Sequence, residues 1–187
     1  MPVPAGYQTT TLKQLLSISL PSNYLSVDLT RETIQSFEQQ YAAAHPGKPD
    51  PFGGFTSSQV AQLMKLMAVE PNASFHTIVM VGVLPTSPID LRKASGSALL
   101  SYVKMQFTGV GGSGASTTLV KLDGTRSALY TATLGAAAVS EPAPARVAAY
   151  LTPRKHSRVA LLFFIVPADG SNDAVLSTMV HSITFTR

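Results

Sequence analysis

The side chains with the clearest catalytic potential in this chain are its four histidines and its serines. A histidine beside a serine and a carboxylate can activate that serine as a nucleophile, and histidines grouped with acids can hold a metal ion. The histidines are scattered, at His45, His76, His156 and His181. None lies in an H-E-x-x-H motif, and no serine lies in a G-x-S-x-G elbow. The sequence therefore assigns no catalytic or metal-binding residue.

A glycine-rich stretch at residues 109–114, GVGGSG, formally satisfies the G-x-G-x-x-G pattern of dinucleotide-binding loops. In such a loop the glycines follow a strand and open a helix. Here the preceding segment has a helical pattern and the following segment a strand pattern, which is the reverse order. A Walker A loop also fails, because Ala115 stands where a lysine should follow Gly114. We expect a connector here and no bound cofactor.

The composition indicates a compact globular protein. Hydrophobic residues make up 45% of the 187 residues and charged residues only 13%, with a formal net charge of +4. This mild charge and the low aromatic content of 7% argue against nucleic-acid binding. There is no cysteine, which excludes disulfides and thiolate metal sites.

No segment is predicted to cross a membrane or to direct export. The longest apolar run, residues 159–166, is far shorter than the ~20 residues that a bilayer requires. The N-terminus lacks a basic segment followed by an apolar one. We expect a cytoplasmic protein as the sequence stands, and an exported or cell-envelope protein if the chain is a mature or trimmed form.

The strongest structural signal is the stretch from Arg146 to Pro167. Its second arm, residues 159–166, is a run of eight apolar residues, typical of a strand covered on both faces. Its first arm, residues 147–151, also fits a strand. The five residues 153–157 between the arms are too few for a crossover, so the arms are predicted to pair as an antiparallel hairpin at the centre of one sheet.

Other strands are predicted from apolar alternation and turn residues, above all at Asp123-Gly124, a strong signal for a two-residue hairpin turn. The expected strands cover residues 15–20, 75–84, 117–122, 125–134 and, briefly, 183–185. Residues 1–14 are expected to be a flexible lead-in, and residues 15–187 a single domain.

Four helices are expected between these strands. Thr30 suits the N-cap of the first, the second begins with a Thr-Ser-Ser-Gln capping box at Thr56, and Ser87-Pro88 suits the start of the third, with Asp90 in its first turn. The second carries an apolar stripe at Val60, Leu63, Met64 and Met67. The third is expected to bury Leu91, Ala94, Ala98, Tyr102 and Met105. The first, third and fourth helices cover residues 30–44, 88–106 and 173–182. This order predicts an α+β fold, an antiparallel β-sheet sandwiched by α-helices.

The order of these segments resembles the Mog1/PsbP-like superfamily, and within it the actinobacterial branch of LpqN-type proteins. The similarity covers roughly residues 15–185. The matching phrases are ISLPSNYLSVD at 18–28, KLMAVEP at 65–71, LVKLDGTRSALYTATL at 119–134, the hairpin at 146–167 and HSITF at 181–185. One departure is Asn23-Tyr24, where family members often have Gly-Trp.

The resemblance implies an α/β/α sandwich built on an antiparallel sheet, and a non-enzymatic role. Characterised relatives act as binding or assembly proteins: a Ran GTPase partner, an accessory photosystem subunit and secreted mycobacterial proteins. Their partners differ, so the fold alone does not name the partner of this chain. No residue of a known partner site can be matched to this sequence.

We therefore expect a non-catalytic protein-binding or adaptor protein without a cofactor. Exposed aromatic residues and arginines are the usual anchors of protein interfaces. The candidate contact residues are Tyr24, Phe52, Phe55, Arg154, Lys155 and His156.

Two alternatives remain open. A hydrolase would need a pocket with a histidine in hydrogen-bond reach of a serine and a carboxylate. A carrier of a small apolar ligand would need an enclosed cavity of at least ~300 Å³ between helix and sheet.

Overall fold

The computed structural model describes most of the chain: residues 3–30, 32–36, 39, 61–71, 73–84, 90–110, 112–139, 141–156 and 158–186. Its strands are β1 (Tyr7–Leu12), β2 (Leu16–Pro21), β3 (Leu25–Asp28), β4 (Met64–Val69), β5 (Ile78–Leu84), β6 (Ser113–Leu122), β7 (Thr125–Leu134), β8 (Ala145–Pro153), β9 (Val159–Pro167) and β10 (Thr184–Phe185). Its helices are α3 (Gly96–Gln106), α4 (Ala136–Val139) and α5 (Asp173–His181).

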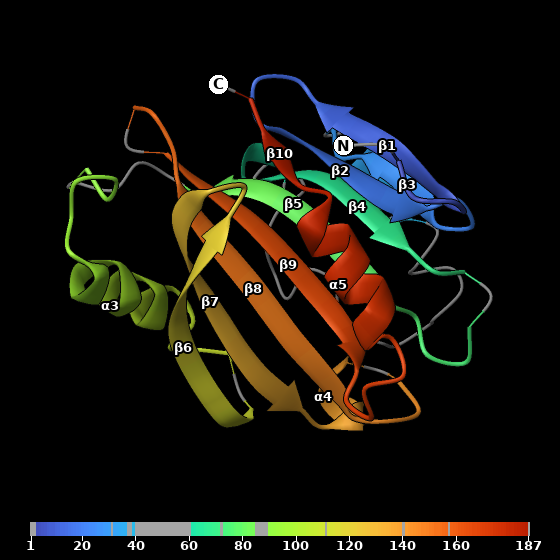
Figure 1. The fold of residues 1–187 in the computed structure, drawn as a ribbon. Helices are drawn as coiled ribbons and strands as arrows, with labels where there is room; N and C mark the ends of the chain where they lie inside the picture. Colours follow the sequence, from blue (N-terminus) through green and yellow to red (C-terminus); the bar gives the residue numbers. More distant parts are fainter. Residues whose placement is uncertain are drawn as a thin grey trace.

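An antiparallel seven-stranded sheet, in the order β3-β4-β5-β9-β8-β7-β6, forms the centre of the molecule (Figure 1). β9 lies in the middle of this order, between β5 and β8. A second, three-stranded sheet has the order β1-β2-β10. Figure 1 shows α5 lying across one face of the large sheet, beside the small sheet, while α3 lies at the β6–β7 side.

The core on one face of the large sheet lies beneath the small sheet and α5. Large side chains of β2 pack there against alternate residues of β9, with Leu176 and Met179 contributed by α5. Its β9 members are Ala160, Leu162, Phe164 and Val166, and its β2 members include Leu16, Ile18 and Leu20.

A second core lies on the opposite face, under α3. Leu99 and Val103 of the helix pack there on β7 and β8, together with Phe107, whose ring stacks on Tyr130 at 4.5 Å between centroids. Its β9 members are Val159 and Leu161, with Phe163 and Ile165 packed against it. β9 is therefore buried on both faces, as its apolar run predicted.

The local hairpin signals are confirmed. β8 and β9 pair antiparallel along their whole length, and β6 pairs with β7 across a turn in which Asp123 (φ 47°) and Gly124 (φ 70°) are both left-handed, as a type I′ turn requires. The last helix and the short final strand are also present as α5 and β10. The fold class is the α+β class expected, an antiparallel sheet covered by helices, with a small second sheet in addition.

Three expectations about individual segments are wrong. Tyr7–Leu12, inside the expected lead-in, forms β1, because its backbone pairs with every residue of β2. Met64–Val69, expected to continue a helix, is β4: Leu66 and Ala68 alternate inward, and pairing with β3 and β5 overrides the helical spacing. That the chain forms a single domain stays a prediction, but the expected start of that domain at residue 15 leaves out β1, which pairs with β2.

The third misplaced segment is the start of α3, which begins at Gly96 and not near Pro88. Ser95 is its N-cap, with its hydroxyl accepting from the backbone N–H of Ala98. Residues 90–94 form a turn, in which Asp90 bonds to Arg92 instead of lying in a helical first turn. The buried helical residues are consequently Leu99 and Val103, while Met105 is 64% exposed.

The structure describes only part of the first expected helix. Residues 32–36 are helical, and the Thr30 hydroxyl accepts from the backbone N–H of Thr33 at 3.2 Å, which confirms Thr30 as the N-cap. The end of that helix and the capping box at Thr56 lie outside the described residues.

Gly82 permits a bulge in β4 that carries Lys65 out of the regular ladder. Met64 pairs with Gly82 and Leu66 with Val81, so Lys65 is the extra residue. A Cβ added at Gly82 would lie 2.3 Å from the Leu63 carbonyl oxygen and 2.8 Å from Met64 Sδ. A side chain larger than hydrogen therefore does not fit beside the bulge.

We expect the Gly82→Ala substitution to lower the free energy of unfolding by about 1–3 kcal/mol, because the new methyl group overpacks against backbone. The measurement is the urea midpoint. Gly109→Ala is the matched control, since nothing lies within 4 Å of a Cβ there. Equal midpoints for the two variants would show that β4 can retreat without cost.

Candidate partner-binding site

A cleft of about 660 Å³ lies where the β8–β9 loop approaches the turn between β1 and β2. Several segments distant in sequence meet at it, including the residues after β3, the bulge of β4 and the end of the chain after β10. Its polar lining includes Lys13, Gln14, Lys65, Arg154, Lys155, His156 and Arg158. The structure thus places all of the expected tip residues, Arg154 to His156, in one cleft.

Arg154 is bound to the body of the protein more tightly than its position at a hairpin tip suggested. Its guanidinium carbon lies 4.5 Å from the centre of the Phe185 ring, and its Nη2 donates to the carbonyl oxygen of Thr186. Burial lowers the pKa of this guanidinium. Its backbone N–H donates to the carbonyl of Arg158 at 2.8 Å and closes the loop. Arg154 therefore ties the β8–β9 loop to β10.

The other two tip residues, Lys155 and His156, are exposed. His156 has a left-handed backbone (φ 58°), as does Gln14 (φ 62°) in the β1–β2 turn on the other side of the cleft. Non-glycine residues in this region are uncommon and cost of order 1 kcal/mol, so they mark places where the surrounding structure dictates the backbone. The loops on both sides of the cleft share this feature.

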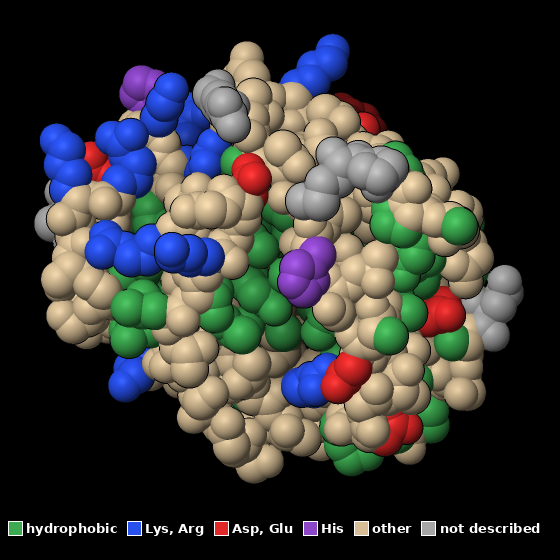
Figure 2. All heavy atoms as spheres, in the orientation of Figure 1, with side chains coloured by type: hydrophobic (Ala, Val, Ile, Leu, Met, Phe, Trp, Pro, Cys, Tyr) green, Lys and Arg blue, Asp and Glu red, His purple; other side chains and the backbone are tan. Residues whose placement is uncertain are grey.

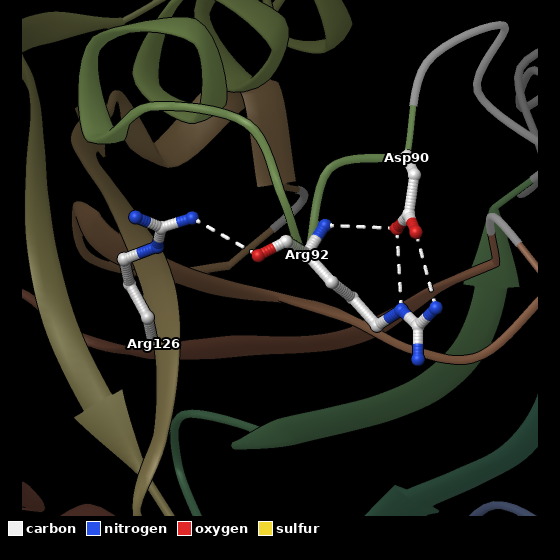
Figure 3. A network of polar contacts seen from close by, with 3 residues as sticks. All are labelled: Asp90, Arg92 and Arg126. Atoms are coloured by element: carbon white, nitrogen blue, oxygen red, sulfur yellow. Dashed lines mark hydrogen bonds and ion pairs between the residues drawn. The ribbon is translucent and has the colours of Figure 1, made fainter.

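A smaller hollow of about 270 Å³ lies beside the cleft, and Arg154 and Lys155 line both. Figure 3 shows how its other cations are held. The Arg92 side chain forks onto Asp90, with Nε–Oδ1 at 3.2 Å and Nη2–Oδ2 at 3.0 Å, which lowers the pKa of that carboxyl. Arg126 donates to the carbonyl oxygens of Arg92 and Ala94. These guanidiniums therefore hold the segment before α3.

Positive side chains are clustered on the surface around the β8–β9 loop. Figure 2 shows Lys and Arg side chains, with a histidine among them, clustered where Figure 1 places the end of the β8–β9 hairpin. The formal net charge of the whole chain is only +4, and the cleft lining alone contains the cations Lys13, Lys65, Arg154, Lys155 and Arg158.

Tyr24 does not present an exposed aromatic surface, contrary to expectation. It is only 4% exposed, and its hydroxyl donates to Oε2 of Glu70 at 3.5 Å. Asn172 Nδ2 donates to the same oxygen at 3.5 Å and to Thr77 Oγ1 at 2.6 Å, which makes a partly buried polar network at the edge of the first core. Burial raises the pKa of Tyr24 to about 12. Phe52 and Phe55 lie outside the described residues.

The described histidines do not form a hydrolytic triad. His181 Nδ1 lies 3.2 Å from Ser177 Oγ and 2.8 Å from the Ser177 carbonyl oxygen. A carbonyl only accepts, so Nδ1 carries a proton for the shorter contact and does not serve as a base towards the hydroxyl. His76 Nδ1 pairs with Glu141 Oε1 at 3.1 Å, and no serine joins that pair within the described part of the chain.

Within the described ranges, no group of three or more His, Asp or Glu side chains is arranged to hold a metal ion. Among the same residues, no helix has the length and apolar character needed to span a bilayer.

Replacing Arg154 by alanine should lower the free energy of unfolding by about 1–2 kcal/mol, since a cation–π contact and a hydrogen bond from a charged donor are lost together. Urea unfolding measures the change. Lys155→Ala, one residue along the same loop, should change it by no more than about 0.5 kcal/mol. The tie to β10 would be contradicted by equal effects of the two substitutions.

The raised pKa of Tyr24 predicts a loss of stability in alkaline solution. The folded state keeps this phenol protonated, so its contribution is complete below the unfolded pKa of 10.0 and disappears as the pH rises towards about 12. The denaturant midpoint is measured at a pH below this window and at a pH within it. The fall in midpoint between the two should be smaller for Tyr24→Phe than for the wild type. Parallel losses in the two proteins would mean that Tyr24 ionises freely in the folded state.

Comparison with known proteins identifies the fold. Neither a protein-family model nor a curated protein sequence matches the chain. Cyanobacterial PsbP (CyanoP) from Synechocystis is similar in structure, with a TM-score of 0.50 and 12% identity over 98% of this chain and 94% of that one. LpqN, involved in cell envelope biogenesis of Mycobacterium tuberculosis, has a TM-score of 0.52 and 9% identity over 92% and 83%. The Ran-binding protein Mog1p of Saccharomyces cerevisiae has a TM-score of 0.47 and 12% identity over 95% and 94%.

At such low identities, similarity to solved structures speaks for the fold and not for the activity. The matches to cyanobacterial PsbP and LpqN cover nearly the whole of each chain compared. Membership of the actinobacterial LpqN-type branch stays a prediction. The chain has the Mog1/PsbP-like fold, as the order of its segments predicted.

Proposed function

We propose that this chain is a non-catalytic binding protein, an adaptor or assembly factor, and that it takes a protein partner at the cleft beside the β8–β9 loop. The observation that carries the proposal is the convergence of loops at this cleft. The β1–β2 turn and the β8–β9 loop each join two paired strands, one in each sheet, so both are held by a rigid scaffold. Binding residues are commonly presented on loops in this way.

The geometry supports binding better than hydrolysis. The pair formed by Ser177 and His181 is a contact between neighbouring turns of α5. The Nδ1–H of His181 donates to the carbonyl oxygen of Ser177, so this nitrogen does not act as a base. The pair formed by His76 and Glu141 has no nucleophile beside it within the described residues. Neither arrangement meets the geometric requirement of nucleophile, base and orienting acid.

A carrier of small apolar ligands is also less well supported. The hollow between the end of α3 and strands β6 and β7 has a volume of about 420 Å³, but it is open to solvent and polar groups share its lining. Its polar lining includes Lys104, Thr108, Ser116 and Thr117, beside Phe107 and Tyr130. A site for an apolar ligand encloses most of the ligand surface.

The compartment decides which partners the protein meets. LpqN is a protein of cell envelope biogenesis and shares this fold. On the strength of this likeness, we propose that the partner of this chain is a protein of the cell envelope.

Site-specific photo-crosslinking tests the proposed function. A photoreactive amino acid is placed at Lys13 or at Lys155, on opposite sides of the cleft, and the variants are irradiated in cells of the source organism. Both positions should yield an adduct with the same protein, because one partner fills the cleft between them. Mass spectrometry identifies the adduct.

Lys104 is the matched control position, since it is an exposed lysine that lines a separate hollow. It should give no adduct with that partner. Adducts from Lys104 alone, or different proteins from Lys13 and Lys155, would place the partner elsewhere and contradict the proposal.

A further inference from the structure

The described lining of the cleft is strongly unbalanced in charge. It holds five of the 14 Lys and Arg residues of the chain against one acid, Asp28, with His156 in addition. The five cations are Lys13, Lys65, Arg154, Lys155 and Arg158. A concave surface of one sign concentrates the field and attracts ligands of the opposite sign.

Three of these cations have no acidic partner among the described residues. Arg154 is engaged with Phe185 and Thr186, and Lys65 donates to the carbonyl of Ala61 at 2.7 Å. The ion pairs between described residues join His76 to Glu141, Arg92 to Asp90 and Arg146 to Asp173, and none of them includes Lys13, Lys155 or Arg158. Within the described lining, these three side chains therefore carry positive charge that no described acid neutralises.

The rest of the lining includes apolar side chains. Leu12, Leu15 and Leu29 line the cleft with 7–9% of their surface exposed, and the partly buried Val83 lines it as well. A lining that combines cations with apolar side chains suits a ligand that has both carboxylates and apolar side chains. A bare polyanion would make no use of the apolar part.

Two other anionic partners fit this lining less well. Proteins that bind single-stranded nucleic acid stack bases on aromatic side chains, and no Phe, Tyr or Trp is among the described residues of the cleft. A membrane-binding surface inserts protruding apolar side chains. The exposed large hydrophobic residues of the described chain lie outside the cleft, at Val3, Leu25, Val27, Met105 and Leu119.

We infer that the cleft binds an acidic segment of the partner protein, in which carboxylates meet Lys13, Lys155 and Arg158 and apolar side chains lie against Leu12, Leu15 and Leu29. This inference rests on the proposed function and specifies the chemistry of its partner.

Fluorescence anisotropy with synthetic probes tests the inference. The probe is a short labelled peptide in which Glu and Leu alternate. Two comparison peptides have Ser in place of Leu, or Lys in place of Glu. Two further comparison ligands are oligothymidylate of the same net charge and vesicles that contain phosphatidylglycerol. The Glu-Leu peptide should bind most tightly, the Glu-Ser peptide more weakly and the Lys-Leu peptide not at all, and added salt should weaken binding.

Charge reversal locates the binding. The double substitution Lys155→Glu and Arg158→Glu should lower the affinity for the Glu-Leu peptide by about tenfold or more, because two attractive contacts become repulsive. Lys104→Glu, the matched control, should change affinity by less than about twofold. Unchanged affinity in the double variant, or equal or tighter binding of oligothymidylate or vesicles, would overturn the inference.

The two proposals fail in different ways. If a partner is crosslinked from both Lys13 and Lys155 but the Glu-Leu peptide does not bind, the inference of an acidic segment is wrong and the proposed partner site stands. Peptide binding at the cleft without any crosslinked protein would overturn the proposed function.

Discussion

Burial of β9 on both faces is the constraint on which the rest of the structure depends. Leu162 and Phe164 lie beneath α5 and the small sheet, and Val159 and Leu161 lie on the side of α3. A strand with no polar face must be covered twice, so the chain needs both a helix layer and a second cover. The β8–β9 loop joins two strands that pair along their whole length, and Arg154 fixes the loop to β10 through its contact with Phe185.

Much of the fold could be predicted because its strongest signals are local. The apolar run of β9 and the Asp123-Gly124 turn each specify a structure within a few residues. Met64–Val69 could not be assigned in this way, since its apolar residues satisfy both helical and strand spacing until β3 and β5 pair with it. The start of α3 was misplaced because Ser87-Pro88 and Ser95 both resemble helix starts, and only packing distinguishes them.

The site was only partly predictable for a related reason. The Arg154 to His156 tip stands out in the sequence as a charged turn between two apolar strands. Lys13 and Lys65 have no such signal, because they join the tip only after strands from distant parts of the chain have paired. Tyr24 was expected at the surface, yet its side chain is buried and its hydroxyl donates to the partly buried Glu70. A tyrosine is easily misjudged in this way, since it has an apolar body and a polar end.

We propose that the surface between the β1–β2 turn and the β8–β9 loop is the binding face of this molecule. NMR can test this by following amide chemical shifts while the Glu-Leu peptide is added. The shifts that move should belong to residues 12–15, 28–30 and 154–158, while those of a hollow formed by β2 and α5 should stay in place. Movement concentrated at that second hollow or along the edge strand β6, with the β8–β9 loop unchanged, would contradict it.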